Sequence, residues 1–141
     1  MKNETPKRGV ATGLVVPEAF LHFIWRFKLF ETRALCSSSG ERIQMLHEGS
    51  LNLYAGPDFF NAKVKIGNQL WAGNIEMHVK SSDWYAHGHE KDPNYDSVIL
   101  HVVWEYDVPV FRKNNEEIST LIVQNFVLPE TWRNFKELFR K

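Results

Sequence analysis

Acidic side chains in the middle third of the sequence have a spacing that suits a metal-dependent hydrolytic site. Asp58 begins an apolar, alternating segment, and Glu76 lies on the segment that returns after the turn at Gly67-Asn68. Because a hairpin brings its two segments side by side, we expect Asp58 beside Glu76, where two carboxylates can hold a hard cation such as magnesium or manganese. That ion would activate water and offset the charge on a phosphodiester. His78 shares a strand face with Glu76 and could be a further ligand or the general base.

Histidines form a second group of candidate ligands. His87-Gly88-His89 precedes Asp92, and together with His78 and His101 it could collect imidazoles for zinc or manganese. The alternative for His87 and His89 is that they decorate an exposed loop. His101 differs because it interrupts an apolar segment, and a buried imidazole there could instead serve structure by hydrogen-bonding a neighbour.

The elements that must position these residues are visible in the periodicity of the sequence. Helical spacing begins at Pro17, and strand-like alternation follows in 42–47 after a turn across 37–40. The clearest feature is a long hairpin of 60–66 and 69–80. A strict two-residue turn would pair Asp58 with Met77 and place Asp58 on the wrong face, unless a bulge or a bend at Pro57 re-aims it.

The second half of the chain predicts one central strand between helices. Ser81-Ser82-Asp83 is a plausible start for a short helix, and the apolar run 98–104 reads as a buried strand. A weaker strand pair is expected at Val110 and 120–126. A terminal helix from about Pro129 would carry the apolar stripe Trp132, Phe135, Leu138 and Phe139. The predicted fold class is α+β, with a central mixed β-sheet that contains a long hairpin and is flanked by helices.

Length and composition limit the architecture and the compartment. With 141 residues and 43% apolar content, the chain can build one domain, which we assign to 17–141, after a flexible tail at 1–16. The lone Cys36 forms no internal disulfide, and neither a signal peptide nor a transmembrane segment is recognisable, so a cytoplasmic, reducing location is expected without membrane attachment.

The charges balance overall but not along the chain. There are 17 basic and 17 acidic residues, so the chain has no excess positive charge of the kind that is typical of nucleic-acid-binding proteins. Residues 34–111 hold five Lys/Arg against ten Asp/Glu, whereas 1–33 hold six against three and 112–141 hold six against four. This pattern fits either an ordinary solvated surface or a cation site between flanks that favour phosphate.

Several motifs, in this order, resemble an uncharacterised bacterial family called domain of unknown function 2851. They are AGPDFFNA at 55–62, WAGNIEMH at 71–78, SSDW at 81–84, HGH at 87–89 and VILHVV at 98–103. The resemblance covers roughly residues 17–126 and implies no activity, since none is assigned to the family. Because family members are considerably longer, it also implies that this chain corresponds to their N-terminal part, and that a later domain could complete a site.

A second resemblance is to the PD-(D/E)xK nuclease superfamily, whose core has the same order of helix, hairpin, long hairpin, helix and strand. It implies a restriction-endonuclease-like core, with Pro57-Asp58 opening one strand and Glu76-Met77-His78 in place of the acidic-x-Lys triplet. His78 departs from the lysine of that triplet, and Lys80 on the same face could substitute. The implied catalytic set is Asp58, Glu76, His78 and Lys80.

The sequence therefore supports two functional hypotheses. The first is a metal-dependent nuclease-like domain that acts on nucleic acid, with candidate metal ligands Asp58, Glu76, His78, His87, His89 and His101. The second is a non-catalytic domain that binds a ligand or a protein within a longer chain, which the missing triplet lysine favours. The sequence contains no Gly-x-Ser-x-Gly motif of serine hydrolases and no Gly-x-x-x-x-Gly-Lys phosphate-binding loop. It also has no Gly-x-Gly-x-x-Gly dinucleotide-binding motif after a predicted strand. Substrate, metal identity and oligomeric state stay open.

Overall fold

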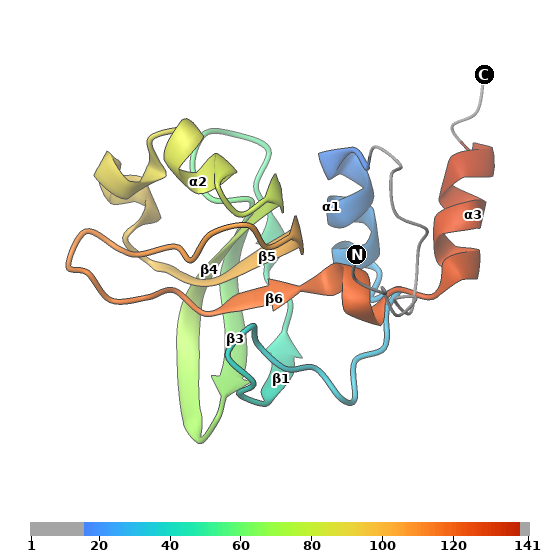
Figure 1. Cartoon of the computed structure of the whole chain (residues 1–141), viewed down its shortest axis with the longest axis horizontal. Helices are drawn as coiled ribbons and strands as arrows, with labels where there is room; N and C mark the ends of the chain where they lie inside the picture. Colours follow the sequence, from blue (N-terminus) through green and yellow to red (C-terminus); the bar gives the residue numbers. More distant parts are fainter. Residues whose placement is uncertain (1–15, 139–141) are drawn as a thin grey trace, which may run out of the picture.

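The computed structural model of the chain describes residues 16–138 and consists of a mixed sheet with helices around it (Figure 1). Of the predicted tail, only Val16 lies within the described residues, and it is buried in the main core. In chain order the elements are α1 (Glu18–Arg26), β1 (Ile43–His47), β2 (Ser50–Leu51), β3 (Phe59–Ile66), β4 (Gln69–Lys80), α2 (Asp83–Ala86), the 3-10 turns η1 (His89–Lys91) and η2 (Pro93–Tyr95), β5 (Val98–Glu105), β6 (Thr120–Ile122), the 3-10 turn η3 (Val123–Phe126) and α3 (Pro129–Leu138).

The strands of the described chain form one sheet in the order β1-β3-β4-β5-β6, and β2 pairs with β3. The β1–β3 and β3–β4 pairs are antiparallel, whereas β4–β5 and β5–β6 are parallel. A parallel pair needs a crossover, and α2, η1 and η2 supply the one between β4 and β5. The α+β class, the mixed sheet and the long hairpin are confirmed.

Alternation along β4 separates two environments on the two faces of the sheet. Ile75 and Met77 join the main core beneath α1 and α3, where Phe20 of α1 contacts Trp132. Glu76 and His78 point to the other face, toward α2 and η1. A smaller core lies at this second face, and its buried residues are Trp84, Tyr95, Val98, Val110 and Ile118. The second face therefore carries the polar candidates against a partly apolar background.

A register shift in the long hairpin decides where Asp58 lies. From Ile66 to Ala62 the pairs follow the strict two-residue turn, but Phe59 pairs with Ile75 instead of with Glu76, which the strict turn would place opposite it. The extra residue is accommodated at Asn61, which has φ 62° and donates its backbone N–H to Asn74 Oδ1 at 3.1 Å. The shift brings Asp58 level with Glu76, so the bulge considered from the sequence is present.

The last predicted strand pair is shorter than expected. β6 ends at Ile122 and the chain turns through η3, while Phe111 and Glu117 form only an isolated bridge. The turn follows from packing, because Val123 is buried and the Phe126 carbonyl accepts the backbone N–H of Glu31 at 2.9 Å. The terminal helix begins at Pro129 as predicted. Within the described chain, no helix has the length and apolar character needed to cross a membrane.

Candidate metal centre

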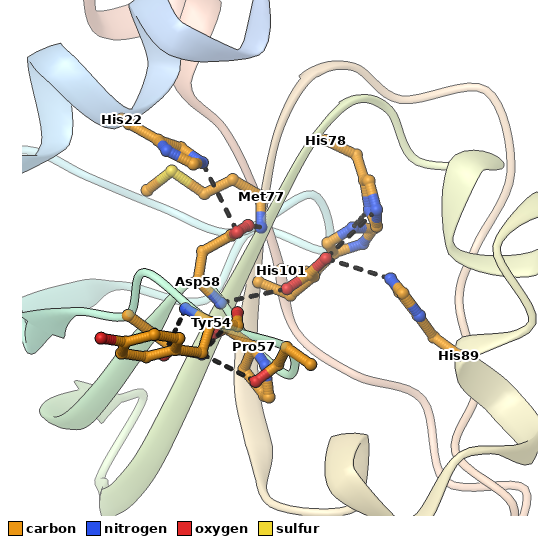
Figure 2. A network of polar contacts seen from close by, with 11 residues as sticks. His22, Tyr54, Pro57, Asp58, Met77, His78, His89 and His101 are labelled. Atoms are coloured by element: carbon orange, nitrogen blue, oxygen red, sulfur yellow. Dashed lines mark hydrogen bonds and ion pairs between the residues drawn. The ribbon is translucent and has the colours of Figure 1, made fainter.

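Three parts of the fold bring the candidate side chains together on the second face of the sheet (Figure 2). β4 presents Glu76 and His78, and His101 of β5 lies opposite Glu76 in the parallel register. The turn after α2 folds His89 back over the sheet, because Gly88 adopts φ 71° between the helix and η1. Glu76 and His101 are 25 positions apart in the sequence, and the fold brings them side by side.

Glu76 occupies the middle of this group, and its two carboxyl oxygens face different partners. Oε1 accepts the backbone N–H of Asp58 at 3.2 Å. Oε2 lies 3.1 Å from His89 Nε2 and 3.2 Å from His78 Nε2. Glu76 is only 4% exposed. This burial, together with the nearby Asp58 carboxylate, raises the pKa of Glu76 to about 9. Without a cation, Glu76 therefore holds a proton at neutral pH.

The imidazoles of His78, His87 and His89 converge on one point and could hold a metal ion. One ring nitrogen of each lies within 4.8 Å of the others. In a tetrahedral zinc site with bonds of about 2.0–2.2 Å, ligand atoms are roughly 3.4 Å apart. The contacts of Glu76 Oε2 with His78 Nε2 and His89 Nε2, at 3.2 and 3.1 Å, are close to this spacing. Burial lowers the pKa of His78 to about 3 and also lowers that of His89, which keeps both rings in the neutral, ligating form.

His101 lies behind His78 and not among the converging nitrogens. It is fully buried, and its Nε2 is 2.7 Å from His78 Nδ1. A metal-bound imidazole donates its other ring N–H to a neighbouring acceptor, and His101 Nε2 is placed to be that acceptor for His78. His101 Nδ1 is buried without a hydrogen-bond partner within the described structure. The predicted role of His101 as a direct ligand is thus less consistent with the geometry than a positioning role.

Asp58 and His22 form the neighbouring, more open half of the site. Asp58 Oδ2 accepts the backbone N–H of Met77 at 2.9 Å, and Oδ1 lies 3.6 Å from His22 Nε2. Interaction with the Asp58 carboxylate raises the pKa of His22, which favours an ion pair. The side chains of His22 and Asp58 are 28% and 22% exposed, and His87 is exposed as well. This side is therefore the more exposed part of the site.

Lys80 is the predicted site residue that the structure leaves apart. It is exposed at the end of β4, and its backbone N–H bonds Asp83 Oδ2 at 3.4 Å. No hydrogen bond or ion pair among residues 16–138 joins its side chain to the cluster. Lys80 is the last residue of β4, and its exposure fits a side chain in contact with solvent.

Three residues of the site were missed as functional candidates from the sequence. His22 was visible only as part of a polar stripe with Glu18 on the first helix, and nothing in the sequence connected that helix to Asp58. Tyr95 stacks on His89 with ring centroids 3.7 Å apart and fixes the plane of that imidazole. Glu18 also belongs to this region, because burial and then the Asp58 carboxylate raise its pKa. Only tertiary contacts could have identified these residues.

No curated protein and no solved structure matches the chain. One family model, described as protein of unknown function (DUF2851), matches residues 18–141, which is most of the sequence. The chain therefore belongs to this family of proteins of unknown function, DUF2851.

Proposed function

We propose that the chain is a metal-dependent hydrolase domain that cleaves phosphodiester bonds in nucleic acid. The observation that carries the proposal is the placement of the Glu76 carboxyl group, with Asp58 on its Oε1 side and two imidazole nitrogens on its Oε2 side. A buried carboxyl that keeps its proton only for lack of a cation is well suited to exchange that proton for a metal ion.

The donor set favours zinc or manganese over magnesium. Neutral imidazoles suit zinc and other transition metals, whereas magnesium prefers an all-oxygen shell. Glu76, His78 and His89 would hold the ion, and the exposed His87 could be the fourth ligand or give way to water. His101 would hold His78 in the required orientation.

A bound metal would supply a water of lowered pKa and offset negative charge on the substrate. Asp58 and His22, next to Glu76 on the open side, would orient that water and take up its proton or pass one to the leaving oxygen. The element order α1, β1, β3–β4 hairpin, α2 and β5 supports the similarity to a restriction-endonuclease-like core, in which Asp58 and Glu76 occupy the acidic positions.

A specific observation favours the alternative of a non-catalytic domain. Glu76 and His78 are at most 4% exposed. If Glu76 joined the grouped imidazoles of His78, His87 and His89, the four donors would close a tetrahedral shell. A closed shell is typical of structural zinc sites, which stabilise a fold and leave no position for water. In that case the domain would serve to bind a ligand or a protein.

Metal binding is tested first, by calorimetry with zinc, manganese and magnesium. We expect zinc or manganese to bind more tightly than magnesium. Glu76→Gln keeps the shape and removes the charge, so affinity should fall by about 100-fold or more. His47→Gln is the matched control, because His47 is exposed at the end of β1 and outside the cluster. If wild type binds none of the three metals, the proposal fails.

Cleavage is tested next with labelled single- and double-stranded nucleic acid. Activity should require the metal, disappear in Glu76→Gln and persist in His47→Gln. His78→Lys distinguishes a site of the nuclease-superfamily type, with two carboxylates and a lysine, from a site that needs the imidazole. The change restores the superfamily triplet but removes one imidazole ligand. Loss of zinc binding with magnesium-dependent activity would favour the superfamily type. Tight metal binding without cleavage of any substrate would favour the non-catalytic domain.

A further inference from the structure

α2 and η1 have an outer side that the candidate metal centre does not use. His89 of η1 points inward to Glu76, whereas Glu90 and Lys91 line a cavity of about 540 Å³. Tyr85 of α2 and residues 111–115 of the segment between β5 and β6 complete its wall. The volume lies within the range of about 300–1,000 Å³ that ligand sites occupy.

Two aromatic rings are exposed at this cavity and held in a fixed relation. Tyr85 and Phe111 are each 38% exposed, although most large apolar side chains of the described chain are buried. The backbone N–H of Phe111 donates to the Tyr85 hydroxyl at 2.9 Å, which ties the 111–115 segment to α2. Exposed aromatic rings on a fixed backbone are suitable platforms for stacking nucleobases.

The charge at the cavity is positive, in contrast to the acidic middle of the sequence. Lys91, Arg112 and Lys113 line it against the single acid Glu90. Arg112 is committed to the fold, because its Nη1 donates to the carbonyl oxygens of Asp96 at 3.1 Å and Val98 at 2.6 Å. Lys91 and Lys113 are exposed and therefore available to phosphate groups.

Glu90 adds an unsatisfied acceptor. Its Oε1 is buried and has no hydrogen-bond partner within the described residues. A buried acceptor without a donor costs free energy, and a rotation of the Glu90 carboxyl toward a ligand N–H group in the cavity would remove that cost. Nucleobases carry such groups on their exposed edges when they are not paired.

We propose that this cavity is a subsite for single-stranded nucleic acid, which we call the strand subsite (Tyr85, Glu90, Lys91, Phe111 and Lys113). Bases would stack on Phe111 and Tyr85, and the lysines would contact the backbone phosphates. This inference rests on the proposed function, because it specifies the substrate: the strand would pass over the exposed His87 and reach Asp58 and Glu76 from the open side.

The test measures binding of a fluorescein-labelled single-stranded DNA of about 15 nucleotides, a length within the usual range of strand-binding sites. Fluorescence anisotropy is recorded with EDTA, so that binding is separated from metal and cleavage. Phe111→Ser, Lys91→Glu and Lys113→Glu change exposed side chains and should each weaken binding roughly ten-fold. Each lysine replacement should also lower the salt dependence by about 0.7 in the log–log slope.

Matched controls use the same changes elsewhere. Lys65→Glu alters the charge at an exposed position of β3, and Phe27→Ser removes a ring that is 56% exposed at the end of α1. Both should bind like wild type, and a duplex of the same sequence should bind more weakly than the single strand. Equal binding by wild type and the three subsite variants, or a preference for duplex, would overturn the strand subsite.

The two proposals fail in different ways. Strand binding that depends on Phe111, without metal-dependent cleavage, would refute the hydrolase and leave the strand subsite in place. Metal-dependent cleavage with unchanged KM in Lys91→Glu and Lys113→Glu would refute the strand subsite and leave the hydrolase in place.

Discussion

At the scale of residues, the pairing of His78 with His101 would contribute to the proposed metal affinity. Metal binding through His78 Nε2 requires a proton on Nδ1, and that proton needs the acceptor that His101 Nε2 provides at 2.7 Å. The same hydrogen bond fixes the plane of the His78 ring. His101 is therefore expected to act on the metal through His78 and without touching it.

Replacing His101 tests this positioning role. His101→Phe keeps the ring volume but removes the acceptor, so zinc affinity should fall by about 10- to 100-fold. His101→Gln can still offer an oxygen and should lose less. Titration calorimetry gives the affinities, and thermal unfolding of the metal-free proteins checks that both variants fold. Equal affinity in wild type and His101→Phe would exclude the positioning role.

At the scale of elements, the close approach of β4 and β5 depends on Gly73. A Cβ atom there would lie 2.5 Å from the Ser97 carbonyl oxygen and 2.6 Å from Cγ2 of Ile99. Both contacts are too short, and the backbone oxygen cannot move without shifting the start of β5. This approach directly precedes the register shift between Asn74 and Ile75, after which Glu76 faces His101.

Gly73→Ala should therefore destabilise the fold and disturb the metal centre together. We expect a loss of about 1–3 kcal/mol in the free energy of unfolding, as is usual for overpacking, with weaker zinc binding. Urea denaturation and calorimetry measure the two effects. Ala72→Ser is the control, because Ala72 is exposed on the same strand. An unchanged unfolding midpoint in Gly73→Ala would contradict the prediction.

At the scale of the whole molecule, the protonation of Glu76 links stability to pH. Between the ordinary value of 4.5 and about 9, the folded metal-free chain keeps a proton that the unfolded chain has lost, so stability falls as pH rises. His78, with its pKa lowered to about 3, has the opposite effect, but only up to its ordinary value of 6.5. Above pH 6.5 the fall in stability caused by Glu76 is no longer offset by the rise caused by His78.

The free energy of unfolding of the metal-free protein should thus fall by about 3 kcal/mol between pH 6.5 and 9. Urea denaturation at a series of pH values measures this change. His22, whose pKa Asp58 raises, contributes in the same direction, so Glu76→Gln isolates the part due to Glu76 and should flatten most of the slope. A wild-type profile that is flat over this range would show that Glu76 is ionised in the fold.

Local patterns in the sequence were sufficient to predict the secondary structure around the site. The turn at Gly67-Asn68, the alternation in 69–80 and the apolar run 98–104 depend on neighbours in the chain, and all three were confirmed. The alternation also predicted correctly that Glu76 and His78 share a face. The order of motifs identified the family, which the match over 18–141 confirms.

Only the tertiary structure decided which of these side chains meet. The shift at Asn61 that brings Asp58 to Glu76 depends on a contact with Asn74 on the opposite strand. The position of His101 behind His78 depends on the parallel register of β4 and β5, which no local pattern encodes. Side-chain spacing along one strand is set by the pleat, whereas distances between elements are set by packing of the whole core. This is why the arrangement of the candidate ligands could be described only from the fold.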